Sequence, residues 1–352
     1  MSPKTIDLRS DTVTRPTPEM RKAMYEAEVG DDVLQEDPTV NRLEAVAAEI
    51  IGKEASLFVP SGTFGNQCCI FAHCSYGDEL IVAERTHIVQ SEVGAAAMIS
   101  GAHLRTFLPD TYPTWADIDL RIRKTDNIHC PPTGLIALEN ALANGEVMPL
   151  EEMQSIYNQS RAYRIPIHLD GARIFNAAEY LGVEGKAIAA CTDSVMFCLS
   201  KGLGSPVGSM VAGDEEFVRI ARRRRKTMGG GMRQAGILAA AGIISLEKMR
   251  LRVGEDRQKA ELLAAALAET GLFEMSPQPV KINMLFARFA EGELHGHEDQ
   301  FVRVLRRHGV LTYAREGGWM RFVTHHDVDF EDIQRLCGLL ERILQETRSE
   351  PT

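Results

Sequence analysis

The 352-residue chain lacks several features that would each point to a class of protein. Its seven cysteines are an odd number and form no CxxC pair, and most lie inside apolar runs, as Cys68, Cys69, Cys198 and Cys337 do. This pattern indicates reduced core cysteines and argues against a disulfide framework and a zinc or other metal site. Positive charge is not in excess either. With 39 Lys and Arg against 49 Asp and Glu, the net charge of −10 argues against nucleic-acid binding and against anionic membranes.

Long hydrophobic runs are also missing. The longest nearly uncharged apolar stretch, 236–246, is too short to span a bilayer. The polar first dozen residues lack the apolar core of a signal peptide. Hydrophobic residues make up 44% of the chain and charged residues 25%, which is typical of globular proteins in water. We therefore expect a soluble, cytoplasmic protein.

What the chain does contain, from residue 55 onwards, is an alternation of short apolar β-type runs with helical segments. The expected strands are 55–59, 79–83, 103–107, 135–138, 166–169 and 194–199, and the helices between them include 64–74, 116–125, 150–163 and 214–228. This alternation predicts parallel βαβ units and a three-layer α/β domain with a mostly parallel sheet. In such open sheets the ligand binds beyond the carboxyl ends of the strands.

The composition changes after residue 250, where strands and helices of a small α+β unit are expected. We therefore predict two domains. The large one covers 1–250, including the N-terminal segment, and the small C-terminal one covers 251–352.

Lys201 follows the apolar run 194–199 and is flanked by Ser200, Gly202 and Gly204. Burial disfavours a charged amine and lowers the pKa of a lysine toward neutrality, which supplies the free amine that a Schiff base needs. The alternative is a strand-end lysine whose amine reaches solvent.

Two further strand ends carry polar motifs. Gly62 and Thr63 lie between an expected strand and a helix, where backbone N–H groups and the Thr63 hydroxyl can hold a phosphate; the alternative is a simple helix cap. The strand 166–169 is followed by Asp170, and Arg173 comes three residues later. A carboxylate at this place can keep a pyridinium nitrogen protonated, and the alternative is a structural Asp170–Arg173 pair.

His87 and Arg321 are two more candidates. His87 follows the strand 79–83, so it is expected to face the same crevice, where it can stack on a ring or take a proton; the alternative is a surface histidine. Arg321 lies among apolar residues in an expected strand of the small domain. Its guanidinium can bind a carboxylate with two prongs in a cleft between domains, and the alternative is a sheet-edge salt bridge.

The basic run 222–226 invites interpretation as a nucleic-acid patch. On a helix, however, these five residues spread around the whole circumference, and we expect a mostly solvated helix end. The following glycines, 229–231, form a flexible turn that can deliver Arg233 to a neighbouring site. Taken together, the phosphate-type turn, the strand-end aspartate and the strand-end lysine at one crevice describe a pyridoxal-phosphate enzyme.

With these motifs the chain resembles the low-specificity L-threonine aldolases, which belong to the aromatic amino acid β-eliminating lyase/threonine aldolase group of fold-type I pyridoxal-phosphate enzymes. The matching segments are 8–14, 60–63, 87–88, 169–173, 200–204 and 226–234. The resemblance implies pyridoxal 5'-phosphate as cofactor and cleavage of L-threonine, L-allo-threonine and related β-hydroxy-α-amino acids to glycine and an aldehyde. It also implies a homotetramer, a dimer of dimers with shared active sites.

The same resemblance implies a role for each residue at the cofactor. Lys201 would form the Schiff base, and Asp170 would pair with the pyridine nitrogen. Arg173 would contact the ring hydroxyl and the substrate carboxylate. Gly62 and Thr63 would hold the phosphate.

Around the substrate, the resemblance places His87 against the ring near the substrate hydroxyl, where either the imidazole or a water that it orders acts as the base. Ser10 and Arg321 would bind the substrate carboxylate. Lys226 and Arg233 would reach the site of the partner subunit.

One segment departs from the family pattern. Where relatives usually have Glu-Asn-Thr-His, this chain has Glu139, Asn140, Ala141 and Leu142, so a histidine that helps surround the β-hydroxyl is missing. The departure leaves open which substrate and stereochemistry are preferred. The alternatives are a β-eliminating lyase of the same fold that releases a keto acid, a racemase-type relative, and a non-catalytic binding protein.

Overall fold

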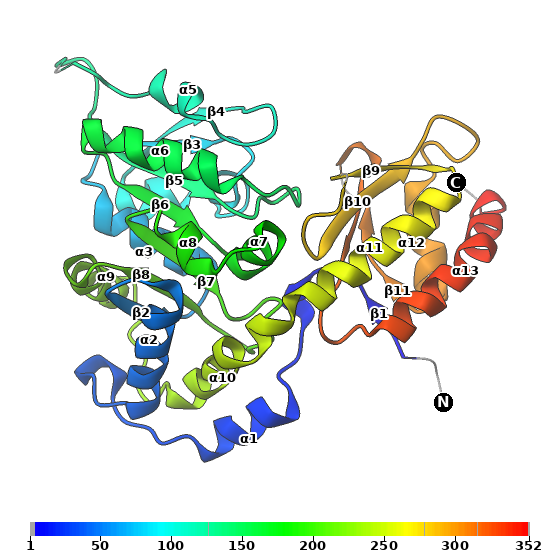
Figure 1. Ribbon diagram of the computed structural model, residues 1–352, viewed down its shortest axis with the longest axis horizontal. Helices are drawn as coiled ribbons and strands as arrows, with labels where there is room; N and C mark the ends of the chain where they lie inside the picture. The colour runs from blue at the N-terminus through cyan, green and yellow to red at the C-terminus, as the bar shows by residue number, and fades with distance from the viewer. Residues whose placement is uncertain (1–3, 126, 278, 315, 351–352) are drawn as a thin grey trace.

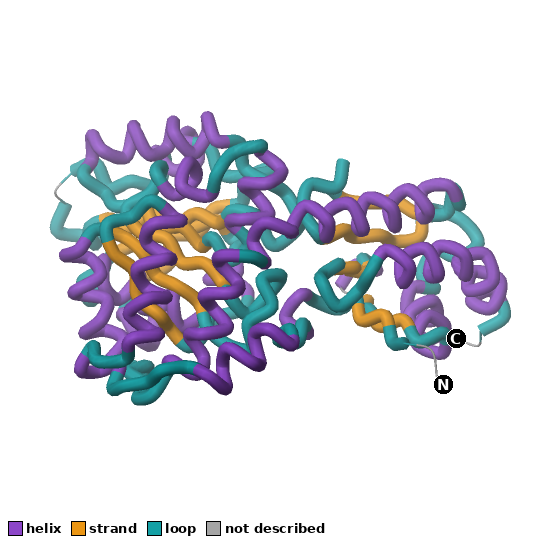
Figure 2. Tube along the Cα trace, turned by 60° about the horizontal axis from the view of Figure 1, so that its bottom comes forward, coloured by secondary structure: helices purple, strands orange, loops and turns teal. Residues whose placement is uncertain are grey.

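Two packed units, bridged by the long helix α11 (Val253–Glu269), make up the protein in this computed structural model (Figure 1). The structure describes residues 4–350 except 126, 278 and 315. The larger unit is built on a sheet covered by helices on both faces, and the smaller one carries helices α11, α12 and α13 beside its strands (Figures 1 and 2).

In the described part of the chain the large sheet has seven strands in the order β2-β8-β7-β6-β5-β3-β4. β8 pairs antiparallel with both of its neighbours, and the other neighbouring pairs are parallel. In chain order the strands are β2 (Ala55–Val59), β3 (Glu79–Ala83), β4 (His103–Phe107), β5 (Thr133–Glu139), β6 (Ile167–Asp170), β7 (Ser194–Cys198) and β8 (Ser209–Gly213).

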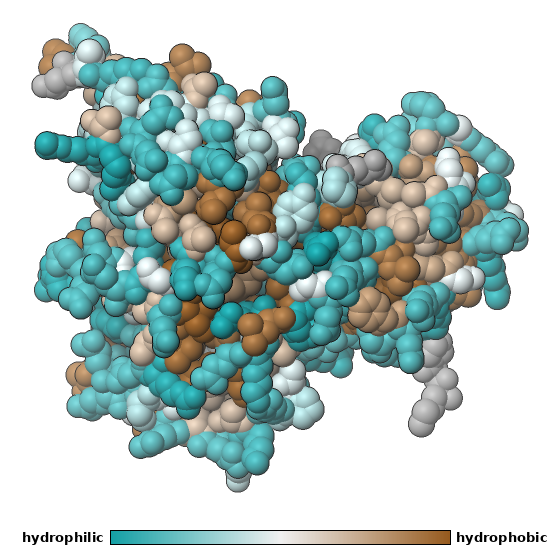
Figure 3. All heavy atoms as spheres, in the orientation of Figure 1, coloured by the Kyte–Doolittle hydropathy of each residue, from teal (hydrophilic) through white to brown (hydrophobic). Residues whose placement is uncertain are grey.

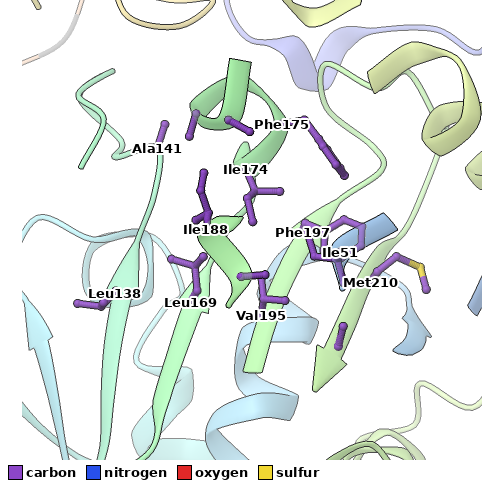
Figure 4. Close-up of a cluster of buried hydrophobic side chains, with 14 of the residues drawn as sticks. Ile51, Leu138, Ala141, Leu169, Ile174, Phe175, Ile188, Val195, Phe197 and Met210 are labelled. Atoms are coloured by element: carbon purple, nitrogen blue, oxygen red, sulfur yellow. The ribbon is translucent and has the colours of Figure 1, made fainter. Parts of the chain in front are cut away.

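Side chains alternate along these strands, so each face of the sheet has its own apolar layer. Leu138, Leu169 and Val195 lie on one face and pack against Ile174 and Ile188 of helices α7 and α8 (Figure 4). On the other face Met196 and its neighbours pack against helices α3 and α9. The result is the expected helix–sheet–helix sandwich.

Short polar residues begin several of these helices by accepting hydrogen bonds from the first free backbone N–H groups. The side chains of Thr17, Asp37, Ser61 and Asp214 do so for α1, α2, α3 and α9. The helices of the large unit are α1 (Pro18–Glu26), α2 (Pro38–Ile51), α3 (Gly62–His73), α4 (His87–Gln90), α5 (Trp115–Asp119), α6 (Leu150–Tyr163), α7 (Ile174–Leu181), α8 (Gly185–Ala189), α9 (Glu215–Thr227) and α10 (Gly236–Glu247). Short helical turns cover Asp11–Val13, Asp32–Leu34, Ala96–Ser100 and Met249–Arg252.

The small unit contains an antiparallel sheet in the order β12-β13-β10-β9, and the N-terminal strand β1 pairs with β11 in parallel. Its apolar cluster therefore includes Ile6 and Leu8 from the start of the chain. The elements are β1 (Ile6–Asp7), β9 (Phe273–Ser276), β10 (Met284–Phe289), α12 (Glu298–Arg307), β11 (Val310–Leu311), β12 (Tyr313–Ala314), β13 (Met320–Val323) and α13 (Phe330–Arg348), with a short turn at Glu316–Gly318.

Strand β10 faces both units. Leu285 and Ala287 belong to the apolar cluster of the small unit, whereas Met284 and Phe286 belong to the cluster of the large unit. Arg321 of β13 is paired in register with Phe286, and paired residues project from the same face of a sheet. Arg321 is therefore presented toward the large unit.

The structure confirms the predicted three-layer α/β class with its small α+β unit, and it differs in detail. Strand β8 and helices α7 and α8 were not expected, and α5 ends at Asp119 rather than near 125. Strand β8 is a short apolar run ending in glycine, a pattern that periodicity alone does not separate from a loop. The domain boundary near residue 250 stays a prediction. None of the helices in the described part of the chain combines the length and apolarity that a membrane crossing needs.

The basic run of α9 is held largely by contacts within the chain. Arg222 pairs with Glu44 at 2.5 Å, and Arg224 lies over the ring of Phe71. Arg225 is buried, pairs with the buried Asp32 at 2.9 Å and donates to the Phe58 carbonyl oxygen at 2.8 Å. The expectation of a mostly solvated helix end is therefore wrong for Arg225, and the run serves to anchor α9 on the large unit.

Replacement of Arg225 by alanine should lower the free energy of unfolding by about 3–5 kcal/mol, because Asp32 would be left as a buried, unpaired charge. Denaturant unfolding followed by circular dichroism measures this loss. Arg223→Ala on the same helix is the control; Arg223 is exposed, and its loss should change the stability by less than about 0.5 kcal/mol. Equal losses in the two variants would contradict the assignment.

Candidate active site

Five segments converge at the carboxyl edge of the large sheet. Helix α3 follows β2, His87 follows β3, Glu139 ends β5, Asp170 ends β6 and Lys201 follows β7. Because these strands are parallel, their ends meet at one edge, and Glu139 and Asp170 are register partners. The structure thus brings to one edge residues that lie far apart in the sequence.

Asp170 is buried at the end of β6, and both of its carboxylate oxygens are held. Oδ1 accepts from the backbone N–H of Ala172 at 3.0 Å, and Oδ2 accepts from the side-chain amide of Asn66 at 2.8 Å. The alternative Asp170–Arg173 pair is not formed: Arg173 binds Asp11 with two prongs, at 2.8 and 2.6 Å. Asp170 is therefore a rigidly oriented carboxylate.

The orientation of Asn66 is set by a chain of buried polar groups behind it. Its Oδ1 lies 3.1 Å from His168 Nε2, and His168 Nδ1 lies 3.0 Å from the Ser194 hydroxyl, which also contacts His73 at 2.8 Å. Burial lowers the pKa of His168 to about 3, so its ring is neutral. Since an amide oxygen only accepts, His168 Nε2 carries the hydrogen, and the amide nitrogen of Asn66 must point toward Asp170.

His87 begins helix α4, and two carboxylates hold it. Its backbone N–H donates to Glu139 Oε2 at 2.7 Å, and its ring Nδ1 lies 2.8 Å from Glu92 Oε1. Glu92 also accepts from the side-chain amides of Asn66 and Gln67, at 2.8 and 2.6 Å. Because Glu92 acts as an acceptor throughout, Nδ1 carries the ring hydrogen and Nε2 is the basic nitrogen of the neutral imidazole. The hydrogen bond to Glu92 raises the pKa of His87, against the opposing effects of burial and of the Lys201 charge.

His87, Glu92 and Asp170 each offer one ligand atom within 4.8 Å of the others, a spacing that a metal ion could bridge. The amide nitrogen of Asn66 donates into this group, to Glu92 and to Asp170. These donated hydrogens satisfy the two carboxylates without a cation, so we interpret the cluster as a hydrogen-bonded network.

Glu139 is a buried carboxyl at the end of β5. Burial raises its pKa to about 7, and the negative charge of Asp170 adds to this shift, while the charge of Lys201 is among the opposing effects. Glu139 therefore changes its charge close to neutral pH.

Lys201 lies in the loop after β7, where its backbone carbonyl accepts from the Thr14 hydroxyl at 2.9 Å. This bond ties the N-terminal segment to the loop that carries Lys201. Burial by itself would raise the pKa of Asp11, but the Arg173 guanidinium outweighs it and holds that pKa well below its usual range, and Lys201 contributes in the same sense. The amine of Lys201 thus shares one electrostatic environment with Asp11, His87 and Glu139.

The N-terminus of α3 packs closely against strand β7. The Ser61 side chain accepts from the Phe64 N–H, and the half-buried Thr63 follows Gly62. A Cβ atom at position 62 would lie only 2.8 Å from the Cys198 sulfur, so glycine is required there. Backbone N–H groups at a helix start favour anions, and phosphate binding by Gly62 and Thr63 stays a prediction.

The remaining predicted residues make contacts of their own outside this network. Ser10 caps the short turn Asp11–Val13, with its hydroxyl oxygen accepting from the Thr12 N–H. Arg321 donates to the Arg9 carbonyl oxygen at 2.7 Å. Lys226 is exposed, and Arg233 is 61% exposed and pairs with Asp31 of the same chain at 2.7 Å.

Sequence reasoning did not assign roles to Asp11, Asn66, Glu92 or Glu139. Asp11 and Glu139 fall in segments that were compared with the family pattern, so their type was visible but their contacts were not. Asn66 lies inside helix α3, and Glu92 lies in a loop. A polar residue at such a place does not by itself indicate a functional role.

The fold and this site together define the class of fold-type I pyridoxal-phosphate enzymes. A threonine aldolase from Leishmania major superposes with a TM-score of 0.84 over 96% of this chain and 99% of its own, at 18% identity, which shows the shared fold. A family model described as β-eliminating lyase matches residues 7–290. The probable low-specificity L-threonine aldolase 2 of Arabidopsis thaliana is 40% identical over 97% of both chains, and the low specificity L-threonine aldolase of Escherichia coli K12 is 42% identical over 95% of this chain and 97% of its own. The chain therefore belongs to the β-eliminating lyase/threonine aldolase family, as the sequence motifs predict.

The raised pKa of Glu139 predicts a pH-dependent stability. A carboxyl whose pKa is about 7 in the folded state, against an ordinary 4.5, contributes stability below pH 4.5 that is lost as the pH rises through 7. Glu139→Gln keeps the acceptor for the His87 N–H and removes the charge, so it should gain about 1–3 kcal/mol over the parent between pH 5 and pH 8. Denaturant unfolding at both pH values measures the gain.

Glu36→Gln, which changes an exposed carboxyl, is the control for that measurement and should track the parent at both pH values. A stability difference between Glu139→Gln and the parent that does not change with pH would show that Glu139 is ionised throughout.

Proposed function

We propose that the protein is a pyridoxal-phosphate-dependent carbon–carbon lyase that cleaves L-threonine, L-allo-threonine and related β-hydroxy-α-amino acids to glycine and an aldehyde. The observation that carries this proposal is the network in which Asn66 joins Asp170 to Glu92, and Glu92 holds the ring of His87. This network holds the imidazole of His87 near Asp170, the carboxylate that we expect at the cofactor ring. The names of the Arabidopsis thaliana and Escherichia coli relatives support the same reaction.

The residues present fit the cofactor. Gly62 lets the start of α3 pack closely against Cys198 of β7, and Asp170 offers a fixed carboxylate to a ring nitrogen. Lys201 would attach the cofactor, Thr63 and Gly62 would hold its phosphate, and Arg173 would lie at the ring hydroxyl. When bound, the cofactor supplies an electron-withdrawing ring that stabilises negative charge at the substrate Cα.

The protein's own residues would orient the substrate and move its proton. Arg321, Ser10 and Arg173 would bind the carboxylate and so direct the Cα–Cβ bond, and Asp11 already fixes the Arg173 guanidinium. His87 would take the β-hydroxyl proton on Nε2, directly or through a water molecule, because Nδ1 is committed to Glu92.

We further propose that the protein is a cytoplasmic homotetramer, a dimer of dimers in which Lys226 and Arg233 reach the partner's site. Both residues are exposed in the single chain. Large apolar side chains are exposed as well, with Leu34 at 63% and Ile237 at 46%. Apolar residues also break the mostly hydrophilic face seen in Figure 3. Burial of such residues between subunits would be favourable.

Product analysis tests the reaction. With pyridoxal phosphate bound, the protein should convert L-threonine and L-allo-threonine to glycine and acetaldehyde, measured by amino-acid chromatography and a coupled aldehyde assay. Lys201→Ala should lose both the activity and the covalent attachment of the cofactor, the latter seen by borohydride reduction and mass spectrometry. Keto acid and ammonia as the products would instead favour β-elimination, and cofactor still attached covalently in Lys201→Ala would contradict the assignment of Lys201.

The role of His87 predicts distinct effects for two variants. His87→Asn should slow cleavage by about 10²–10⁴-fold and leave the cofactor bound. Glu92→Gln should move the acid limb of the pH–rate profile to lower pH, because the Glu92 hydrogen bond raises the pKa of His87. Stopped-flow rates between pH 5 and pH 9 measure both effects. An unaltered rate in His87→Asn would remove this residue from the mechanism, and an unmoved acid limb in Glu92→Gln would remove Glu92 from its positioning role.

A further inference from the structure

A cavity of about 210 Å³ is lined in part by Glu139, which accepts the backbone N–H of His87 in the proposed site. Its walls come from the ends of β3 and β5, from the loop after β4 and from β10 of the small unit. The apolar part of the lining consists of Ala83, Pro109, Pro113, Leu142, Ala143 and Phe286.

Two contacts connect this cavity with the site. Thr86 and Glu139 also line it, and Glu139 accepts the backbone N–H of His87, the residue next to Thr86. On the opposite side Phe286 is the register partner of Arg321, so both project from one face of the small sheet. A substrate with its carboxylate at Arg321 and its hydroxyl at His87 would direct its β-substituent into this space.

The size and lining of the cavity suit an apolar group larger than methyl. Apolar cavities of about 150 Å³ in proteins take up benzene. Leu142 presents a half-buried hydrocarbon side chain to the cavity. The polar residues Arg85 and Thr111 of the lining are exposed, which places them at the mouth, while Pro109, Pro113 and Phe286 are buried.

We propose that this cavity binds the β-substituent of the substrate and that Leu142 makes the protein prefer aryl or branched-alkyl β-hydroxy-α-amino acids over threonine. The proposal rests on the cleavage reaction proposed above. Burying the additional apolar surface of an aryl group should raise kcat/KM by about 10–200-fold relative to the methyl group of threonine, the range seen for single apolar increments in a pocket.

Two variants test the cavity from different sides. Leu142→His replaces the apolar wall with an imidazole, and Ala143→Phe fills the cavity from an exposed position, so that folding is not at risk. Each should lower the ratio of kcat/KM for phenylserine to that for threonine by at least about tenfold, measured on the same diastereomer of each substrate. Leu251→His, at a leucine that is 69% exposed and remote from the cavity, should leave the ratio unchanged.

A binding measurement separates failure of this inference from failure of the proposed reaction. Calorimetric titration of the loaded protein with L-phenylalanine and L-alanine, which have no hydroxyl group to cleave from, should give tighter binding of phenylalanine, and Ala143→Phe should abolish the difference. If threonine is cleaved but neither the kinetic ratio nor the binding difference responds to the variants, the cavity assignment is wrong. If no substrate is cleaved, the proposed reaction is wrong, and the binding difference alone then supports or overturns the cavity.

Discussion

The Asn66 amide is the contact on which the site depends. Its nitrogen has two hydrogens, and each is directed at a buried carboxylate, one on Asp170 and one on Glu92. Two carboxylates this close would repel each other in a medium of low polarity. The shared donor offsets that repulsion. Because the His168 ring fixes the orientation of the Asn66 amide, Asp170 and Glu92 are held in fixed positions relative to each other.

A second constraint is the N-terminal segment, which contacts both the small unit and the large unit. The N-terminal strand adds to the small unit, while Thr14 and Asp11 reach back to Lys201 and Arg173. The alternation of side chains along β10 and β13 then presents Phe286 and Arg321 to the large unit. Arg321, the proposed ligand of the substrate carboxylate, and the cavity wall residue Phe286 therefore come from one face of the small sheet.

The parts of the site that are readable in the sequence are those that follow a strand. Lys201, Asp170, His87 and the Gly62 turn each come directly after an apolar run, and parallel strands bring such positions to one edge without further information. The buried hydrogen bonds and ion pairs that support these residues cannot be read in the same way. Asn66 contacts Asp170 across 104 positions of the chain, and Arg225 contacts Phe58 across 167 positions and Asp32 across a longer span still. These partners are therefore not visible from local pattern.

The sequence by itself determined the alternation of strands and helices, the order of the strand-end residues and the family, because hydrophobic period, turn residues and motif spacing are local properties of the chain. Only the tertiary structure decided that Arg173 binds Asp11 rather than Asp170 and that Glu92 directs the imidazole of His87. It also decided that Leu142 and Phe286 close one cavity from two units. Those outcomes depend on side chains that compete for partners in three dimensions, and the winner is set by distance and burial, which the linear sequence does not contain.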